Sequence, residues 1–171
     1  SYEGLYQAIQ TGKGLEGTVE FFPEEGRYHF DGHRKCGVSL SPTEAERLGE
    51  ICPVCGKKLT MGVDHRVEQL ADREEGFVKE DGRKYESLVP LPEVISACMG
   101  YSTASKKVQG CFEQMLQKLG TEFDILRNVP AEDIKSCAGA RIAEGIENVR
   151  TGHVKRIPGY DGEYGKIELF D

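Results

Sequence analysis

The sequence predicts an α+β protein, in which a small zinc-ribbon-like module with short strands is followed by a mainly helical domain. Two pairs of possible metal ligands, His33-x-x-Cys36 and Cys52-x-x-Cys55, lie in the first half of the chain with fifteen residues between them. Beyond residue 90, apolar residues recur at the three- and four-residue spacing of amphipathic helices. The charged, glycine-bearing stretch between these patterns indicates a boundary.

We therefore expect four segments along the 171 residues. The metal-binding module is placed at 27–75, a linker at 76–89, and the helical domain, with a C-terminal loop and strand, at 90–171. Residues 1–26 are expected to be the end of a preceding domain, because the chain opens at Ser1, without a methionine, inside a helical pattern.

The segment before the metal ligands is expected to hold one helix and two strands. Residues 1–12 place apolar side chains along one helical face and stop at Gly12, a common helix terminator. Residues 17–22 and 27–30 have strand composition, and the Pro-Glu-Glu-Gly sequence at 23–26 predicts the turn between them.

Two short helices are expected beside the metal ligands. Ser41-Pro42-Thr43-Glu44 is a capping box with proline at the first helical position, so a helix should span about 42–48. Residues 64–71 are typical of a second helix, with Asp64 as its cap. The charged stretch that follows, 72–83, is typical of a linker or mobile loop.

The helical domain is predicted from its periodicity. Short helices are expected at 92–98, 122–128, 130–137 and 140–150, together with a closing strand at 166–170. A longer helix, capped by Ser102 or Thr103, should run to Leu119 with Val108 and Met115 on its apolar face.

The two ligand pairs, His33 with Cys36 and Cys52 with Cys55, predict a structural zinc site. Two tight turns that each supply two ligands can close a tetrahedron, and four protein ligands leave no position for water or substrate. Gly37 and Gly56 follow the second ligand of each turn and permit the backbone conformation that such a turn requires.

The fourth ligand stays open at this point, because His29, His65 or an aspartate could replace His33. Iron in a rubredoxin-like centre is disfavoured, since that centre uses four thiolates and this region has three cysteines. Cys98, Cys111 and Cys137 lie at apolar helical positions and are expected to be small buried side chains.

Composition limits the classes of function. The net charge of −7 argues against a surface that binds nucleic acid all over, because phosphate neutralisation needs clustered Lys and Arg. No apolar run approaches the roughly 20 residues that cross a bilayer, and no leader pattern is present, so we expect a cytoplasmic protein without a membrane partner.

Local basic and aromatic residues are nevertheless candidates for contact with nucleic acid. They are Arg34, Lys35, Lys57, Lys58, Lys106 and Lys107, with Tyr160 and Tyr164 as possible stacking rings. Solvated surface positions explain each basic pair equally well. Residues 125–146 also have the spacing of a helix-hairpin-helix clamp, without its Gly-x-Gly signature; an ordinary helical bundle is the alternative.

The chain resembles the endonuclease Q family. Residues 17–73, with GTVEFFPEEGRYHFDGHRKCGVSLSPTEAE and ICPVCGKKLTMGVDHRVEQLADRE, carry most of the resemblance, which continues at 105–108, 139–152 and 158–162. It implies an N-terminal PHP metallohydrolase domain, a zinc-binding module and a C-terminal helical domain. It also implies nicking of DNA on the 5′ side of deaminated bases and at abasic sites, with divalent metals held by the PHP domain.

The resemblance makes residues 1–26 the remnant of a PHP-type domain, whose His and Asp motifs would lie before Ser1. We therefore expect a DNA-binding, zinc-containing part of a DNA repair endonuclease that does not cleave DNA by itself, with damaged duplex and the missing PHP domain as its partners. The alternative is a zinc-ribbon module that binds protein and has no nucleic-acid role. A redox metalloprotein is a remote third reading.

Overall fold

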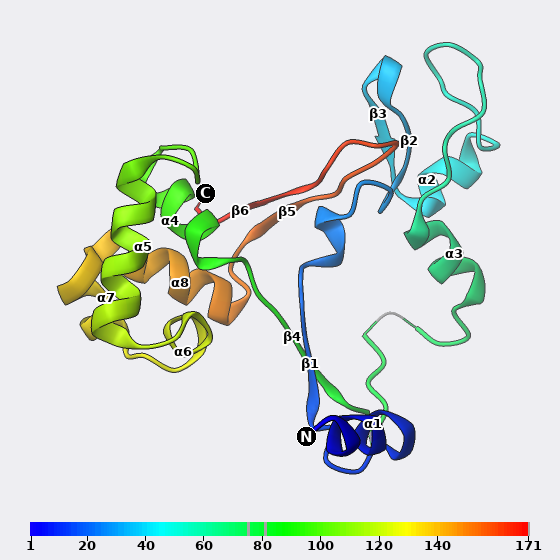
Figure 1. The fold of residues 1–171 in the computed structure, drawn as a ribbon. Helices are drawn as coiled ribbons and strands as arrows, with labels where there is room; N and C mark the ends of the chain where they lie inside the picture. Colours follow the sequence, from blue (N-terminus) through cyan, green and yellow to red (C-terminus); the bar gives the residue numbers. More distant parts are fainter. Residues whose placement is uncertain (75, 81, 171) are drawn as a thin grey trace.

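The computed structural model describes residues 1–74, 76–80 and 82–170. Figure 1 shows a helical domain on one side, a ligand module that holds the Cys and His pairs on the other, and a small N-terminal lobe below them. The fold class is α+β, as predicted. In the part of the chain that the structure describes, no helix is long and apolar enough to span a membrane.

The helical domain packs around a single apolar core. Its helices are α4 Leu91–Met99, α5 Lys106–Leu119, α6 Glu122–Arg127, α7 Ala131–Ala138 and α8 Ala140–Thr151. The core side chains with no exposed surface include Leu91, Ile95, Val108, Met115, Ile125, Ile134 and Ile146. Cys98, Cys111 and Cys137 are free thiols that pack, half-buried, against this core.

The cap of α5 differs from the prediction, and Arg150 makes contacts that the sequence did not predict. The cap of α5 is Ser105, whose hydroxyl accepts from the Val108 N–H, so the predicted caps Ser102 and Thr103 are wrong. Arg150 of α8 donates to the backbone carbonyls of Ile125, Leu126 and Val129 at 2.7 to 2.9 Å, and so joins the ends of α6 and α8.

The ligand module has short elements and a very small core. They are β2 Asp31–His33, the 3-10 helix η2 Arg34–Cys36, β3 Val38–Leu40, α2 Pro42–Arg47 and α3 Val63–Leu70, with β2 antiparallel to β3. The capping box at Ser41 and Glu44 is present, as predicted. Buried apolar side chains of this core are Val38, Ala45, Cys52 and Leu59.

The predicted cap of α3, Asp64, is wrong. The cap position is Gly62, and its N–H donates to Oδ1 of the fully buried Asp31 at 2.6 Å. The other oxygen of Asp31 lies 2.7 Å from Nδ1 of the buried His65. The first N–H groups of the helix, those of Val63 and Asp64, donate to the backbone carbonyls of Tyr28 and His29, so a distant segment replaces the local cap that the sequence pattern offered.

The predicted pairing of 17–22 with 27–30 is also wrong. The strand β1 Gly17–Glu20 pairs in parallel with β4 Lys84–Ser87, and Pro23–Glu25 forms the 3-10 helix η1. Residues 27–30 are engaged elsewhere, because the carbonyls of Tyr28 and His29 accept from the first turn of α3. The pairing of β1 with β4 takes up residues 84–87 of the expected linker at 76–89. Leu88 and Val89, at the end of that linker, are buried in the core of the helical domain.

The N-terminal lobe consists of α1 Tyr2–Thr11, β1 and β4, and it has almost no core of its own. No residue of α1 is buried. Exposed apolar side chains of the lobe are Tyr2, Leu5, Tyr6, Ile9, Val19 and Tyr85. Parallel sheets normally have both faces covered, so this two-stranded pair is an unusually open one.

A β-hairpin, here called the arm, links the helical domain to the ligand module. Its strands are β5 Lys155–Ile157 and β6 Lys166–Glu168, and they run antiparallel from the helical domain to the region of β2 (Figure 1). The arm tip, residues 158–165, docks through its backbone: the Gly159 carbonyl accepts from the N–H groups of His29 and Phe30, at 3.1 and 2.9 Å.

Candidate metal centre and nucleic-acid interface

The four side chains of the predicted metal site come together. One ligand atom each from His33, Cys36, Cys52 and Cys55 lies within 4.8 Å of all the others. A tetrahedral zinc site with bonds of about 2.3 Å has ligand atoms about 3.8 Å apart, so the cluster is close to a binding geometry. The donor set, one imidazole and three thiols, also suits zinc.

The local fold explains why these side chains converge. Gly37 and Gly56 both adopt the left-handed conformation, with φ of 65° and 70°, and each closes a tight turn. The Gly37 N–H donates to the Arg34 carbonyl at 3.0 Å, and the Gly56 N–H donates to the Cys52 carbonyl at 2.9 Å. Each turn therefore presents its two ligands on one side.

The other candidates for the fourth ligand are engaged elsewhere. His65 is buried against Asp31, and the ring of His29 stacks on that of Phe30 with 5.4 Å between their centroids. Nδ1 of His33 lies 3.3 Å from Sγ of Cys55. The cluster can therefore hold a metal ion through His33 and the three cysteines.

The thiols of the cluster differ in acidity. Burial opposes ionisation of Cys52, but the backbone N–H groups of Cys55 and Val54 and the His33 ring stabilise its thiolate and lower its pKa to about 6. Burial and the neighbouring thiols of Cys55 and Cys52 raise the pKa of Cys36 to about 11. One thiolate therefore exists at neutral pH before a metal arrives, whereas Cys36 must lose its proton to the incoming ion.

This difference predicts how metal affinity depends on pH. Between pH 7 and 9 the metal displaces the Cys36 proton, so affinity should rise by about tenfold per pH unit or more. Below about pH 6, protonation of Cys52 adds a further competing proton, and the decrease becomes steeper. Competition with a chromophoric chelator across this range measures the slope, and an affinity that is flat from pH 7 to 9 would contradict the expectation.

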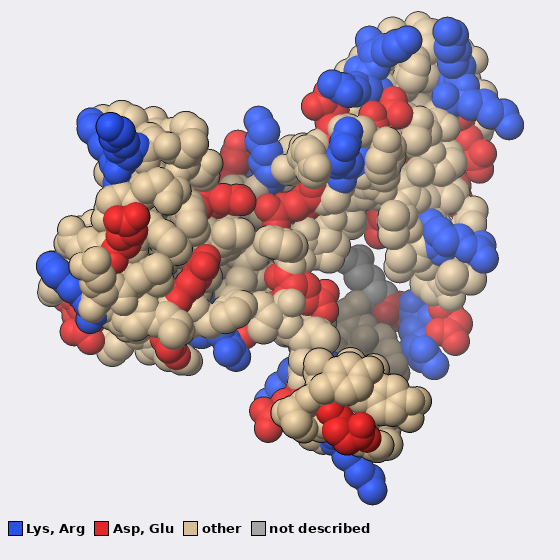
Figure 2. Space-filling model, viewed as in Figure 1, with Lys and Arg blue, Asp and Glu red and all other residues tan. Residues whose placement is uncertain are grey.

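The basic residues predicted to contact nucleic acid lie on two parts of the molecule. Figure 2 shows Lys and Arg gathered over the outer end of the ligand module, with small separate groups among neutral and acidic surface elsewhere on this face. Lys35, Lys57 and Lys58 of that module are exposed, and Arg34 pairs with Glu163 of the arm tip. Lys106 and Lys107 are the first residues of α5 in the helical domain.

The two predicted stacking tyrosines have different surroundings. Tyr160 packs against Gly32 of β2, where even a Cβ would collide with the ring, so this tyrosine helps to dock the arm. Tyr164 is 70% exposed, and the Arg27 guanidinium lies 5.0 Å from its ring centroid. Only Tyr164 presents a largely open ring face to solvent.

The region with helix-hairpin-helix spacing forms a tight pair of helices. A single residue, Gly139 with φ of 95°, joins α7 to α8. The first turn of α8 has neither a side-chain cap nor an acidic residue, and its Arg141 guanidinium lies 4.0 Å from the ring centroid of Phe170. Among the described residues, no side chain caps the N-terminus of α8.

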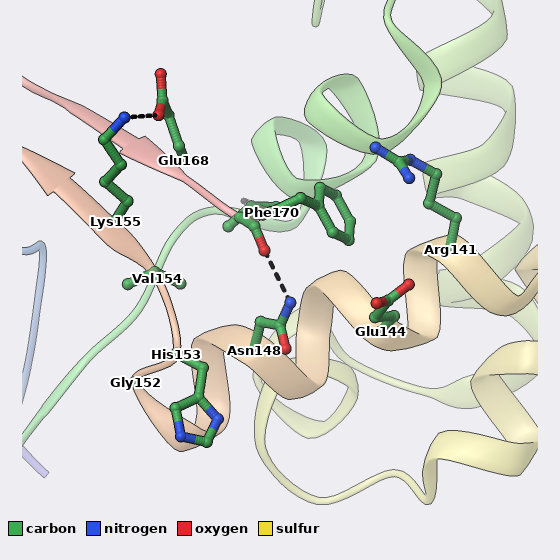
Figure 3. Close-up of a pocket in the computed structure, with 10 residues that line it drawn as sticks. Arg141, Glu144, Asn148, Gly152, His153, Val154, Lys155, Glu168 and Phe170 are labelled. Atoms are coloured by element: carbon green, nitrogen blue, oxygen red, sulfur yellow. Dashed lines mark hydrogen bonds and ion pairs between the residues drawn. The ribbon is translucent and has the colours of Figure 1, made fainter.

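A hollow of about 820 Å³ lies where α8 meets the base of the arm. Figure 3 shows Asn148 of α8 donating to the backbone carbonyl of Leu169, the residue before Phe170. Arg141 and Glu144 lie nearer the N-terminus of α8, and His153 lies beyond its C-terminal end. Lys155 pairs with Glu168 at 3.0 Å at the opposite wall. The wall carries both charge signs, so it favours no single class of ligand.

Sequence reasoning missed the role of Asp161 at the arm tip. Its carboxylate accepts from the Arg34 N–H and from the Thr60 hydroxyl. Burial alone would raise its pKa, but these hydrogen bonds and the nearby His33 hold the pKa below its usual range. The Gly-Tyr-Asp-Gly sequence at 159–162 signals a turn, and nothing in it indicates a partner more than 100 residues away.

Residues 90–153 match a family model described as the MJ0043 C-terminal domain. The chain is 32% identical over 171 residues to the uncharacterized protein MJ0043 of Methanocaldococcus jannaschii, covering 99% of this chain and 21% of the relative. It is 28% identical over 147 residues to the uncharacterized protein YqxK of Bacillus subtilis, covering 85% of this chain and 34% of that relative.

Two solved structures resemble the chain over almost its whole length. The lesion-specific endonuclease PfuEndoQ of Pyrococcus furiosus superposes with a TM-score of 0.84 and 30% identity, over 98% of this chain and 42% of that one. Endonuclease Q in complex with a 27-mer duplex substrate with an abasic lesion at the active site gives a TM-score of 0.83 and 28% identity, over 100% and 43%. The predicted resemblance to endonuclease Q is confirmed, and the chain spans less than half of these relatives.

Proposed function

We propose that this chain is the DNA-holding, zinc-containing part of a DNA repair endonuclease that acts at deaminated bases or abasic sites, and that cleavage takes place in another domain. The observation that carries the proposal is the match of the entire chain to endonuclease Q solved with a lesion-containing duplex, at a TM-score of 0.83. The chain spans only 43% of that relative, so the endonuclease activity of a longer protein is itself proposed and is not assigned to these 171 residues.

The metal in this proposal is structural zinc bound by His33, Cys36, Cys52 and Cys55. All four positions of a tetrahedron are filled by protein atoms, so the ion offers no open site for a substrate. Its task is to fix the two chelating turns, which are flanked by the basic residues at 34–35 and 57–58. Zinc thus fixes the conformation of the surface that carries these basic residues.

Phosphate contacts are assigned to two surfaces. The first is the outer end of the ligand module, with Arg34, Lys35, Lys57 and Lys58. The second is the start of α5, where Lys106 and Lys107 lie at the positive end of the helix dipole and no acidic residue offsets them. A DNA phosphate would relieve this unfavourable arrangement, and Tyr164 could add a stacking contact.

The N-terminal lobe is proposed to pack against a further domain of the PHP type. Its two parallel strands leave Val19 and Tyr85 exposed, and α1 exposes Leu5 and Ile9 on its surface. A parallel sheet of this kind usually continues into more strands with helices on both faces. The longer relatives have room for such a domain, since the chain spans 21% to 43% of their lengths.

Binding of the 171-residue chain to a labelled duplex with one abasic site tests the DNA role. Fluorescence anisotropy at two salt concentrations should show binding that weakens as salt rises. The double variant Lys57→Glu with Lys58→Glu should bind about tenfold more weakly or worse, with a salt slope smaller by about two, because two phosphate contacts are lost.

The matched control reverses two exposed charges on the lobe, Lys13→Glu with Lys84→Glu, and should leave the salt slope unchanged. If the wild-type chain does not bind the duplex at low salt, the DNA role is wrong for this part of the enzyme. That outcome would favour the protein-binding alternative, which is supported by the exposed apolar stripe of Val63, Val67 and Leu70 along α3.

A further inference from the structure

Asp161 is held in a demanding conformation at the tip of the arm. Its φ is 41°, in the left-handed region that aspartate tolerates better than most residues. Both carboxylate oxygens are engaged: Oδ2 accepts the backbone N–H of Arg34 at 2.6 Å, and Oδ1 accepts the Thr60 hydroxyl at 2.7 Å. The backbone and the two hydrogen bonds together fix the direction of this carboxylate.

The two contacts of Asp161 reach both halves of the candidate metal centre. Arg34 directly follows the ligand His33 and begins the 3-10 turn that ends at Cys36. Thr60 lies five residues after Cys55, and its backbone exchanges two hydrogen bonds with Gly32, at 2.8 and 2.9 Å. One carboxylate therefore joins the first chelating turn to the segment that returns from the second.

We propose that Asp161 is a positioning residue for the metal centre, which holds the two chelating turns together and makes metal binding and arm docking stabilise each other. Groups outside the ligand sphere that orient the ligands typically change metal affinity by about 10- to 100-fold when removed. A coupling of this kind is reciprocal, so the metal stabilises the docked arm by as much as the docked arm stabilises metal binding. The inference rests on the zinc site of the proposed function and is independent of the DNA role.

The arm tip offers a matched control in Glu163. This residue also contacts Arg34, but through the guanidinium group, and the two side chains are about half exposed, at 46% and 56%. An exposed ion pair contributes little to stability and does not touch the ligand turn's backbone. Removing Glu163 therefore perturbs the same loop without loosening the metal ligands.

Metal binding to Asp161→Gly in the 171-residue chain tests the proposal, because glycine removes both hydrogen bonds and tolerates the φ of 41°. Zn²⁺ binding is measured by chelator competition and Co²⁺ binding by its thiolate absorption. The Zn²⁺ affinity should fall about tenfold or more, and the Co²⁺ spectrum should change because the ligand geometry loosens. Thr60→Val, which removes one of the two hydrogen bonds, should shift the affinity less in the same direction. Glu163→Gln should stay within about twofold of wild type.

Hydrogen exchange at 158–165 supplies the second readout. In the wild type, Zn²⁺ should slow exchange of the arm tip, and in Asp161→Gly it should not. The proposal is overturned if Asp161→Gly matches Glu163→Gln in Zn²⁺ affinity and keeps the wild-type Co²⁺ spectrum. If Asp161→Gly loses its helical circular dichroism, Thr60→Val replaces it as the test, and an unchanged Zn²⁺ affinity in Thr60→Val overturns the proposal equally.

Discussion

Removing the metal with a chelator will unfold the ligand module and release the arm tip, while the helical domain keeps its secondary structure. The apolar core of the ligand module is limited to Val38, Ala45, Cys52 and Leu59, and one of these is itself a ligand. A structural zinc ion contributes on the order of 10 kcal/mol to a module of this size, far more than such a core supplies.

The helical core is separate from that of the ligand module, so it should survive. Hydrogen exchange measured with and without chelator should show lost protection at 27–70 and at 158–165, and retained protection in α5 and α8. A single cooperative loss of protection across all these segments would show that the two cores unfold as one unit. Refolding on addition of Zn²⁺ separates metal loss from irreversible damage.

Replacing Gly165 by alanine will destabilise the chain by about 3 kcal/mol or more. A Cβ at this position would overlap the backbone carbonyl oxygen of Glu24 and would lie 2.6 Å from that of Ile157. Both neighbours are backbone atoms, and the overlap with Glu24 can be relieved only by moving the arm away from η1. Urea unfolding measures the change in free energy from the shift of the midpoint.

Gly110→Ala is the matched control for the same chemical change. This glycine lies inside α5, and nothing lies within 4 Å of the added Cβ. Alanine has the higher helix propensity, so this variant should be more stable by about 0.5 to 1 kcal/mol. If Gly165→Ala lowers the free energy of unfolding and Gly110→Ala raises it, the loss comes from the docking of the arm and not from the change of glycine to alanine. A Gly165→Ala variant as stable as the wild type would contradict the prediction.

Local signals predicted the local structure. The capping box of α2, the chelating turns and the apolar face of α5 each depend on residues within a few positions of one another, and all three are present. Within each turn the two ligands converge because a glycine in the left-handed conformation closes it. The pairing of ligands inside each turn therefore needed no long-range information, whereas the approach of the two turns depends on contacts such as the bridge between Gly32 and Thr60.

Long-range contacts decided the features that the sequence did not predict. The strand composition of 27–30 suggested a hairpin, but α3 and the arm tip take up its backbone groups. Asp64 has the pattern of a cap, yet the carbonyls of Tyr28 and His29 accept from the first turn of α3, because the fold brings this distant segment to the helix start. The partners of Asp161 lie 101 and 127 residues away, beyond the reach of any periodicity.

The pairing of β1 with β4 also decides how the chain would bear mechanical load. The register joins Gly17 to Lys84 and Glu20 to Ser87, so the 63 residues between the strands leave at one end of the pair and return at the other. A pull on the two ends of the chain draws β1 backward and β4 forward, which loads the evenly spaced hydrogen bonds of a parallel pair in shear. Tension between those ends therefore runs across the ladder and bypasses the metal ligands.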